Sequence, residues 1–293
     1  MIKIVILASL LIAFSQQQAK YLPVVFLPGL GDSCENLLYV FIDDMRDEVS
    51  NKIFCIDPTA GFSLSTPAME RQVNSICEGL EKLVNEGWDL RDGFIFVGLS
   101  EGGLKARAAL QVCRMGEYVK KLISIGGPQN GVGAVPHTGM DIFSDIINSV
   151  TNGLAYTTLV QATIEPTNYF HRIDDESLYF HSGIPLAKYN NVLNNNSSII
   201  DRVSSLDALV LIMFSQDTMV EPKESAHFGF YKDHTKKEIV GMRDSQMYKE
   251  DWIGLKGLDR AGKIFFHEWT GEHLSFDIDD LRRDVFPHLY PNF

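Results

Sequence analysis

The sequence predicts an α/β fold in which a mostly parallel sheet carries a helical insertion. Over the first 130 residues, short apolar runs alternate with segments of helical periodicity, as in repeated βαβ units. A helical region without a clear strand follows at about 131–206, and an apolar run at 209–214 returns to the strand pattern. The 293 residues, 45% hydrophobic and 22% charged, suffice for one globular domain with an insertion.

The first half supplies four strands and the helices between them. Each predicted strand is a short apolar run, the pattern of a strand buried on both faces of a parallel sheet. Right-handed crossovers would place the strands in one sheet. The expected strands are 23–27, 53–56, 94–97 and 122–125, and the expected helices are 36–49, 66–84 and an alanine-rich segment that ends at Met115.

The second half begins with the insertion, which follows the strand at 122–125, in the region of the sixth strand of such a fold. Helical segments are expected within it at 142–150 and 154–164. After it we expect strands at 209–214 and 263–268 and a last helix at 278–285. The sequence therefore predicts one domain over 16–293, with residues 131–206 as a lid.

The segment Gly98-Leu99-Ser100-Glu101-Gly102 matches the nucleophile elbow, in which glycines relieve crowding around a serine on a sharp turn. An apolar strand precedes it and a helix follows, which is the context that the motif requires. The alternative is a serine that only caps the helix. We predict the α/β-hydrolase fold, with Ser100 as the nucleophile.

A serine hydroxyl needs a histidine to accept its proton and a carboxylate to orient that histidine. In this fold the acid follows the serine in the chain and the histidine comes last. Asp217 lies just after the strand at 209–214 and is the candidate acid, with Glu221 as second choice. The alternative for Asp217 is an aspartate that only stabilises a turn.

Three histidines follow this acid in the last part of the chain. His273 is the candidate base, because it lies in a polar, glycine-containing loop beyond the strand at 263–268. His267 would lie inside that strand, and His288 follows a proline at a helix end, so both are expected to be structural. The expected oxyanion donors are the amides of Glu101, after the nucleophile, and Leu30, in the glycine-containing loop after the first strand.

The N-terminus has the features of a targeting signal. Lys3 is followed by an apolar segment and by Ala13-Phe14-Ser15, so we expect residues 1–15 to be a signal peptide, with Ala19 as a second cleavage position. An uncleaved anchor is the alternative, but the apolar stretch is short for a membrane span, and no later stretch is long enough. Asn195 and Asn196 each begin an Asn-x-Ser sequon, which predicts glycosylation on an exposed loop.

Four cysteines accompany this signal. In an oxidising compartment they are expected to form two disulfides, and four cysteines allow three pairings. The net charge of −12 argues against nonspecific binding of nucleic acid, whose phosphates such a surface would repel. We expect a monomer. The four cysteines are Cys34, Cys55, Cys77 and Cys113.

The chain resembles the palmitoyl-protein thioesterases, most closely those of the lysosomal type-one class, from about residue 21 to 291. The resemblance rests on several segments that together are more specific than the elbow alone. It implies Ser100 as nucleophile, Asp217 as orienting acid and His273 as base, which agrees with the choices made from the residues. The segments are PGLGDSC at 28–34, GLSEGG at 98–103, SIGGPQNGV at 124–132, HFGFY at 227–231 and IGLKGLDRAGK at 253–263.

Two departures from the family pattern stand out. Glutamine is usual after the serine, but this chain has Glu101, whose carboxylate would oppose a developing oxyanion. We therefore predict that Glu101→Gln raises the turnover number. The family's adjacent cysteine pair is here Cys34-Glu35, so Cys34 pairs with Cys55 or stays free. Cys77 and Cys113 resemble a family disulfide.

The insertion is rich in apolar side chains. They either form the insertion's own core or line an acyl groove, and the resemblance favours a groove for a palmitoyl-type chain. The groove candidates are Ile142, Phe143, Ile146, Ile147, Val150, Leu154, Leu159 and Val160.

Together these observations predict a serine hydrolase that removes palmitoyl groups from S-acylated cysteines of proteins or peptides, without a metal or cofactor. It would act in the secretory pathway, in the lysosome or outside the cell. Two alternatives stay open: an oxygen-ester lipase or lipid acyltransferase with the same three residues, and an inactive hydrolase fold that binds a lipid or protein.

Overall fold

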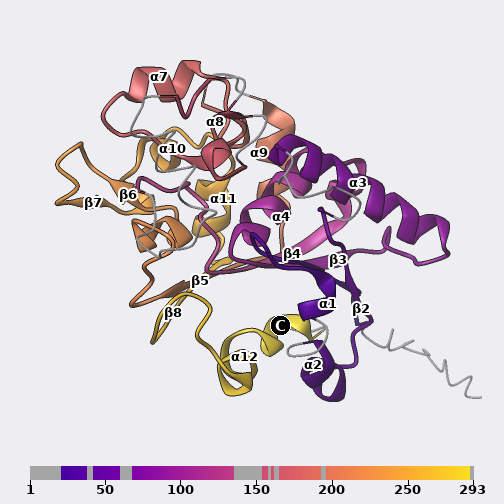
Figure 1. Cartoon of the computed structure of the whole chain (residues 1–293). Helices are drawn as coiled ribbons and strands as arrows, with labels where there is room; N and C mark the ends of the chain where they lie inside the picture. The colour runs from indigo at the N-terminus through magenta and orange to yellow at the C-terminus, as the bar shows by residue number, and fades with distance from the viewer. Residues whose placement is uncertain are drawn as a thin grey trace, which may run out of the picture.

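The computed structural model describes residues 21–37, 42–59, 68–134, 154–157, 160–161, 165–192 and 196–290. Its centre is a six-stranded sheet of order β2-β1-β3-β4-β5-β8, in which every pair of neighbouring strands is parallel. The α/β-hydrolase fold expected from the sequence is therefore present (Figure 1). The strands are β1 (Val24–Leu27), β2 (Ile53–Cys55), β3 (Phe94–Leu99), β4 (Val119–Ile125), β5 (Ala208–Phe214) and β8 (Ile264–Trp269).

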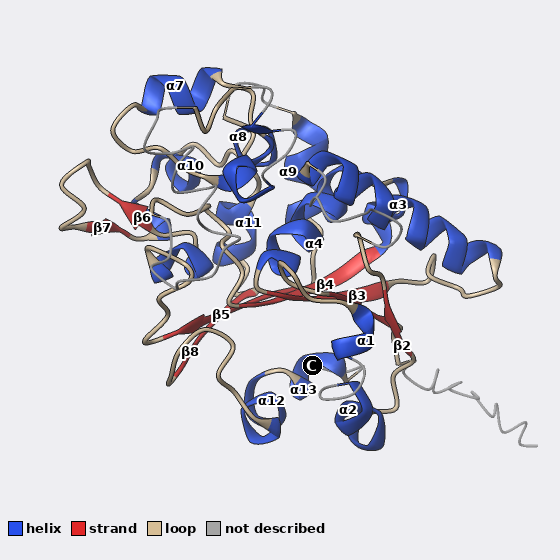
Figure 2. Cartoon of the chain, viewed as in Figure 1, coloured by secondary structure: helices blue, strands red, loops and turns tan. Residues whose placement is uncertain are grey.

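Helices cover both faces of the sheet (Figure 2). Successive strand residues point to opposite faces, so that Val25 and Leu27 pack with α3 and α4, while Val24 and Phe26 pack with α2, α12 and α13. The two apolar cores fix the sheet between two helical layers. The layer on the first face includes α3 (Met69–Asn85) and α4 (Glu101–Val112), and that on the second α1 (Cys34–Leu37), α2 (Asp43–Glu48), α12 (Ile278–Asp284) and α13 (Phe286–Leu289).

The predicted strands are present with small shifts at their ends. The largest shift is in β4, which starts at Val119 rather than at 122. The first residues of this strand include Lys120 and Lys121, and these two charged residues interrupt the apolar run by which the strand was predicted. The Lys121 side chain is buried, and its Nζ donates to the carbonyl oxygen of His288 at 2.7 Å. The helix expected at 36–49 is instead α1 and α2, with residues 38–41 outside the described part.

The described part of the insertion contains several short helices and no strand of the sheet. They include η3 (Glu165–Tyr169), α7 (Glu176–His181), α8 (Pro185–Tyr189) and α9 (Ser197–Ser204). Asn168 ties the insertion to the core, since its Oδ1 accepts from the first N–H of α3, that of Met69, at 2.9 Å. The segment expected at 142–150 lies outside the described residues. The helix expected at 154–164 does not begin where predicted, because residues 154–157 form a turn. Residues 160–161 are helical, and the other five positions of this range lie outside the described residues.

Between β5 and β8 the chain forms short elements that the sequence did not reveal. A two-stranded antiparallel hairpin projects from this region (Figure 1). The elements are η4 (Lys223–His227), β6 (Phe230–Tyr231), β7 (Ile239–Val240), η5 (Met242–Asp244), α10 (Gln246–Lys249) and α11 (Leu255–Arg260), while η2 (Arg114–Tyr118) precedes β4.

Two disulfides link the described elements. Cys34 pairs with Cys55, which joins α1 to β2, so Cys34 is not a free thiol. Cys77 pairs with Cys113, which joins α3 to the end of α4. The helix before the elbow strand is therefore bonded to the helix after it.

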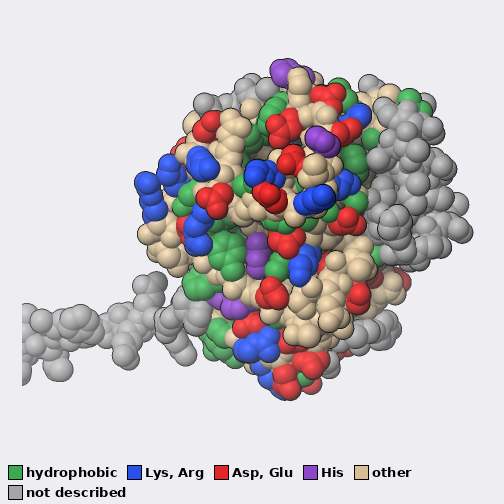
Figure 3. All heavy atoms as spheres, turned by 90° about the vertical axis from the view of Figure 1, so that its left-hand side faces the viewer, with side chains coloured by type: hydrophobic (Ala, Val, Ile, Leu, Met, Phe, Trp, Pro, Cys, Tyr) green, Lys and Arg blue, Asp and Glu red, His purple; other side chains and the backbone are tan. Residues whose placement is uncertain are grey.

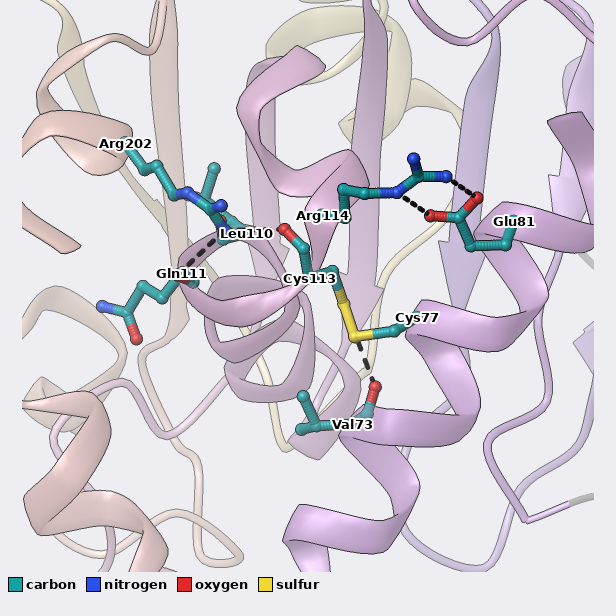
Figure 4. Close-up of a disulfide and its surroundings, with 8 residues drawn as sticks. All are labelled: Val73, Cys77, Glu81, Leu110, Gln111, Cys113, Arg114 and Arg202. Carbon is teal, nitrogen blue, oxygen red and sulfur yellow. Dashed lines mark hydrogen bonds and ion pairs between the residues drawn. A yellow bond between two sulfur atoms is a disulfide. The ribbon is translucent and has the colours of Figure 1, made fainter. Parts of the chain in front are cut away.

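Polar contacts surround this second disulfide (Figure 4). Arg114 donates from Nε and Nη2 to the two carboxylate oxygens of Glu81 on α3, at 2.8 and 2.6 Å. Arg202 of α9 donates to the carbonyl oxygens of Gln111 and Cys113, at 3.0 and 2.6 Å. The last carbonyl groups of a helix lack hydrogen-bond donors within it, and Arg202 supplies donors to them at the end of α4. Its positive charge also interacts favourably with the negative end of the helix dipole.

Acidic and basic side chains are interspersed on the face shown in Figure 3. The described part of that face thus presents no continuous basic stripe of the kind that nucleic acid requires. Of the helices that the structure describes, none combines the length and apolar character needed to cross a bilayer.

Candidate active site

Ser100 lies on the sharp turn between β3 and α4. Its φ of 51° and ψ of −129° are outside the ordinary regions for a residue with a side chain. The turn is tight because a Cβ on Gly98 would lie 2.3 Å from the carbonyl oxygen of Gly102, and one on Gly102 would lie 2.3 Å from that of Leu27. Only glycines fit at these two positions, so they allow the strained turn that exposes the serine hydroxyl.

Asp217 lies three residues beyond the end of β5, at the same edge of the sheet as Ser100. Its side chain is 1% exposed. The Oδ1 atom accepts from the backbone N–H groups of Met219 and Val220, both at 2.8 Å. These two bonds fix the carboxylate and leave Oδ2 for a different partner.

His273 joins these two side chains. Its Nδ1 lies 2.7 Å from Asp217 Oδ2, and its Nε2 lies 2.8 Å from Ser100 Oγ. Since an ionised carboxylate only accepts, Nδ1 carries a proton and Nε2 is free to accept the serine proton. The loops are linked a second time, because the hydroxyl of Thr218 donates to Glu272 Oε2 at 3.0 Å.

The competing candidates lie elsewhere. Glu221 Oε1 accepts from the hydroxyl of Tyr231 at 2.9 Å. His267 is inside β8, with its Nδ1 3.1 Å from the carboxylate of Asp284. His288 is buried in α13, where burial above all lowers its pKa to about 4. None of these side chains has Ser100 among its hydrogen-bond partners.

A hollow of about 360 Å³ opens beside Ser100 and His273. The loop after β1 forms one wall, and its lining includes Leu30, while Glu101 at the start of α4 lies on another side. The first N–H groups of a helix have no partner within it, so the Glu101 amide can donate to a bound group. Leu30 and Glu101, the two expected donors, thus face one space with Ser100.

The rest of the hollow is largely apolar, and the sequence did not point to the residues that line it. Met219 and Val220 lie two and three residues after Asp217, and this position could have revealed them, because residues close to an acid at the sheet edge face the same space. Tyr169 belongs to the insertion, and no local sequence pattern indicates that its side chain reaches the hollow. The remaining apolar lining residues are Pro128, Val132 and Leu274.

The groove candidates from the sequence do not line this hollow where the structure describes them. Leu154 is 48% exposed, and neither it nor Val160 is among the lining residues. The other six candidates lie outside the described residues, as do the predicted signal peptide and Asn195. Asn196 is described and exposed, at the N-cap of α9.

The model of one protein family, described as palmitoyl protein thioesterase, matches residues 23–273. The chain belongs to this family. The matched segment contains all three residues of the hydrogen-bonded relay. It also agrees with the resemblance inferred from the sequence segments, and family and fold together support thioester hydrolysis as the general activity.

Members of the family from distant organisms are similar over most of their length. Palmitoyl-protein thioesterase 1 of Caenorhabditis elegans is 31% identical over 276 residues, which cover 92% of each chain. Palmitoyl-protein thioesterase 3 of Dictyostelium discoideum is 30% identical over 221 residues, 74% of each chain. Among solved structures, monoacylglycerol lipase of Paleococcus ferrophilus is 12% identical, with a TM-score of 0.49 and coverage of 92% of this chain and 95% of the lipase.

Proposed function

We propose that the protein hydrolyses palmitoyl thioesters on S-acylated cysteines of proteins or peptides, with Ser100, His273 and Asp217 as a catalytic triad. The observation that carries the proposal is the hydrogen-bonded relay from Ser100 Oγ through His273 to Asp217 Oδ2, with distances of 2.8 and 2.7 Å. Membership of a thioesterase family supports the choice of a thioester over other acyl compounds.

In the first half-reaction Ser100 Oγ attacks the thioester carbonyl carbon while His273 Nε2 takes the serine proton. The oxyanion that forms would accept from the amides of Leu30 and Glu101, each of which is worth about 3–4 kcal/mol of barrier. As the carbonyl re-forms, the C–S bond breaks, and the cysteine thiolate leaves with the proton from His273.

In the second half-reaction water attacks the acyl-serine ester, and His273 accepts a proton from that water. Collapse of the second oxyanion breaks the bond to Ser100, which regains its proton, and the fatty acid leaves. Asp217 stays ionised throughout and stabilises the imidazolium that forms twice. Every step uses side chains and amides of this chain and one water.

The apolar side of the hollow would receive the first part of the acyl chain. Burying each methylene of the chain is worth about 0.8 kcal/mol, so affinity should rise steeply with chain length. The predicted groove residues of the lid, 142–160, would receive the remainder. The apolar lining at Val132, Tyr169 and Met219 supports the first part of this proposal, that the hollow receives the start of the acyl chain.

We propose that the protein enters the secretory pathway and ends in the lysosome or outside the cell. Support comes from the two disulfides, which persist in oxidising compartments, and from relatives such as human lysosomal thioesterase PPT2, which is 26% identical. The exposed Asn196 is the proposed glycosylation site, together with its neighbour Asn195.

The test is release of palmitate from an S-palmitoylated peptide, measured beside the matched oxygen ester. Wild type should cleave the thioester, Ser100→Ala should not, and Ser205→Ala, at an exposed serine that caps α9, should behave as wild type. Preference for the oxygen ester would favour a lipase instead. A folded wild type that cleaves neither ester and ignores a fluorophosphonate would favour a binding protein.

A further inference from the structure

The carboxylate of Glu101 is buried immediately beside the proposed nucleophile. Glu101 is 1% exposed and is the first residue of α4, directly after Ser100. Its backbone amide is one of the two proposed oxyanion donors, so its side chain puts a negative charge close to the place where negative charge develops in the reaction. A charge of the same sign in a dry site would oppose that development.

A lysine one helical turn further on balances this charge. Lys105 Nζ lies 2.7 Å from Glu101 Oε2, and both side chains are 1% exposed. The same Nζ donates to Oε1 of Gln72 on α3 at 2.6 Å. Because residues i and i+4 lie on one face of a helix, the pair directs the carboxylate along α4.

Among the described residues, Lys105 is the only partner found for this carboxylate. Neither oxygen of Glu101 has a hydrogen-bond donor in good geometry within the described chain. Buried ions are retained in proteins when they are paired, and one left alone is strongly unfavourable. Lys105 therefore decides whether the charge beside Ser100 is compensated.

We propose that Lys105 is a positioning residue for the acyl-transfer reaction. It cancels the field of the Glu101 carboxylate at the oxyanion and holds that carboxylate along α4, so that the Glu101 amide can donate to the oxyanion without an opposing charge. The inference rests on the proposed function of Ser100 and its neighbours. It assigns to a lysine outside the triad a role in the rate of the chemical step.

A purely structural role for the pair is the competing explanation. The pair and Gln72 link α3 to α4, but the disulfide between Cys77 and Cys113 already bonds these two helices covalently. The two explanations differ in what they predict for kcat of the folded enzyme. Loss of a helix contact lowers stability, whereas loss of charge compensation lowers kcat with little change in KM.

The experiment compares three variants with wild type on an S-palmitoylated peptide: Lys105→Met, Glu101→Gln, and the double variant. Lys105→Met leaves the carboxylate uncompensated, and we expect kcat to fall about tenfold to hundredfold with KM nearly unchanged. In the double variant the site is neutral, so kcat should return to within about threefold of wild type. Glu101→Gln should turn over at or above the wild-type rate.

The matched control is Lys82→Met on α3. Lys82 also pairs with a glutamate four residues on, Glu86, but both side chains are exposed, so its removal should leave kcat unchanged. Full kcat in folded Lys105→Met, or a double variant as slow as that single variant, would overturn the proposal.

If Lys105→Met does not fold, the comparison of Glu101→Gln with the double variant still decides. Once Glu101 is neutral the lysine has no charge to balance, so adding Lys105→Met should not lower kcat further, and a large additional loss would overturn the proposal. A wild-type enzyme that does not cleave the peptide at all would instead reject the proposed function, which separates the two failures.

Discussion

The change Asp217→Asn tests the hydrogen-bonded relay from Ser100 through His273 to Asp217. It replaces the carboxylate oxygen that orients His273. Oδ1 of Asp217 accepts from two backbone N–H groups, at 2.8 Å each, and Oδ2 faces His273 Nδ1 at 2.7 Å. An asparagine in this position keeps both backbone bonds only if its oxygen takes the place of Oδ1. Its NH₂ group then faces His273.

An NH₂ group can only donate, so Nδ1 of His273 must become the acceptor and its proton must move to Nε2. In that tautomer Nε2 cannot accept the proton of Ser100, which lies 2.8 Å away. Loss of the correct tautomer costs about 10⁴ in kcat, or ~5.5 kcal/mol of barrier. Stability should change little, because the buried side chain keeps its size and its bonds to the loop.

The assay is kcat on an S-palmitoylated peptide, with the melting temperature measured on the same preparations. Glu221→Gln is the matched control. Glu221 was the second candidate for the acid in the sequence, but it accepts a hydrogen bond from Tyr231 rather than from a histidine. We expect Glu221→Gln to retain most of its activity. The reasoning is refuted if Asp217→Asn keeps more than about a tenth of the wild-type kcat, or if both variants lose activity equally.

Three further predictions concern stability. Alanine at Cys77 and Cys113 opens a link across a sequence separation of 36 residues, so the free energy of unfolding should fall by about 4 kcal/mol in a denaturant titration. An unchanged value would contradict a stabilising role for this disulfide. Burial lowers the pKa of His171 from 6.5 to about 4, so between these pH values the unfolded chain binds a proton that the folded chain does not. The free energy of unfolding should therefore decrease as pH falls through this range, and the same slope in His171→Gln would refute the assignment. Gly98→Ala would bring a Cβ within 2.3 Å of a carbonyl of α4, so we expect no folded protein that reacts with a fluorophosphonate. Gly257→Ala in α11, whose nearest contact would be at 3.7 Å, should keep or raise the melting temperature, and similar damage in both would argue against a special constraint at Gly98.

Much of the fold follows from local patterns in the sequence. Buried parallel strands such as β3 and β5 are continuous apolar runs, and they were found because no polar face interrupts them. The positions of Ser100, Asp217 and His273 follow from the same logic, since each comes just after a strand and parallel strands end at one edge. Here the motif and the strand order agree on one site.

Other features depend on contacts between distant parts of the chain. Two lysines obscure the start of β4 in the sequence. Lys121 is nevertheless buried, and its Nζ donates to the carbonyl oxygens of His288 and Tyr290 near the C-terminus. Tyr169 reaches the hollow through the packing of the insertion, and the balance between Glu101 and Lys105 depends on burial that composition does not reveal. In the sequence Glu101 has no evident partner for its charge, whereas in the folded protein it pairs with Lys105.

The central claim is that Ser100 carries the acyl group during turnover. The direct measurement is to mix the wild-type enzyme briefly with an S-palmitoylated peptide, quench in acid, digest, and locate the acyl group by mass spectrometry. We expect one palmitoyl group, as an oxygen ester, on the fragment that contains Ser100, and none in Ser100→Ala. Palmitate on another residue, or an active Ser100→Ala enzyme, would contradict the account.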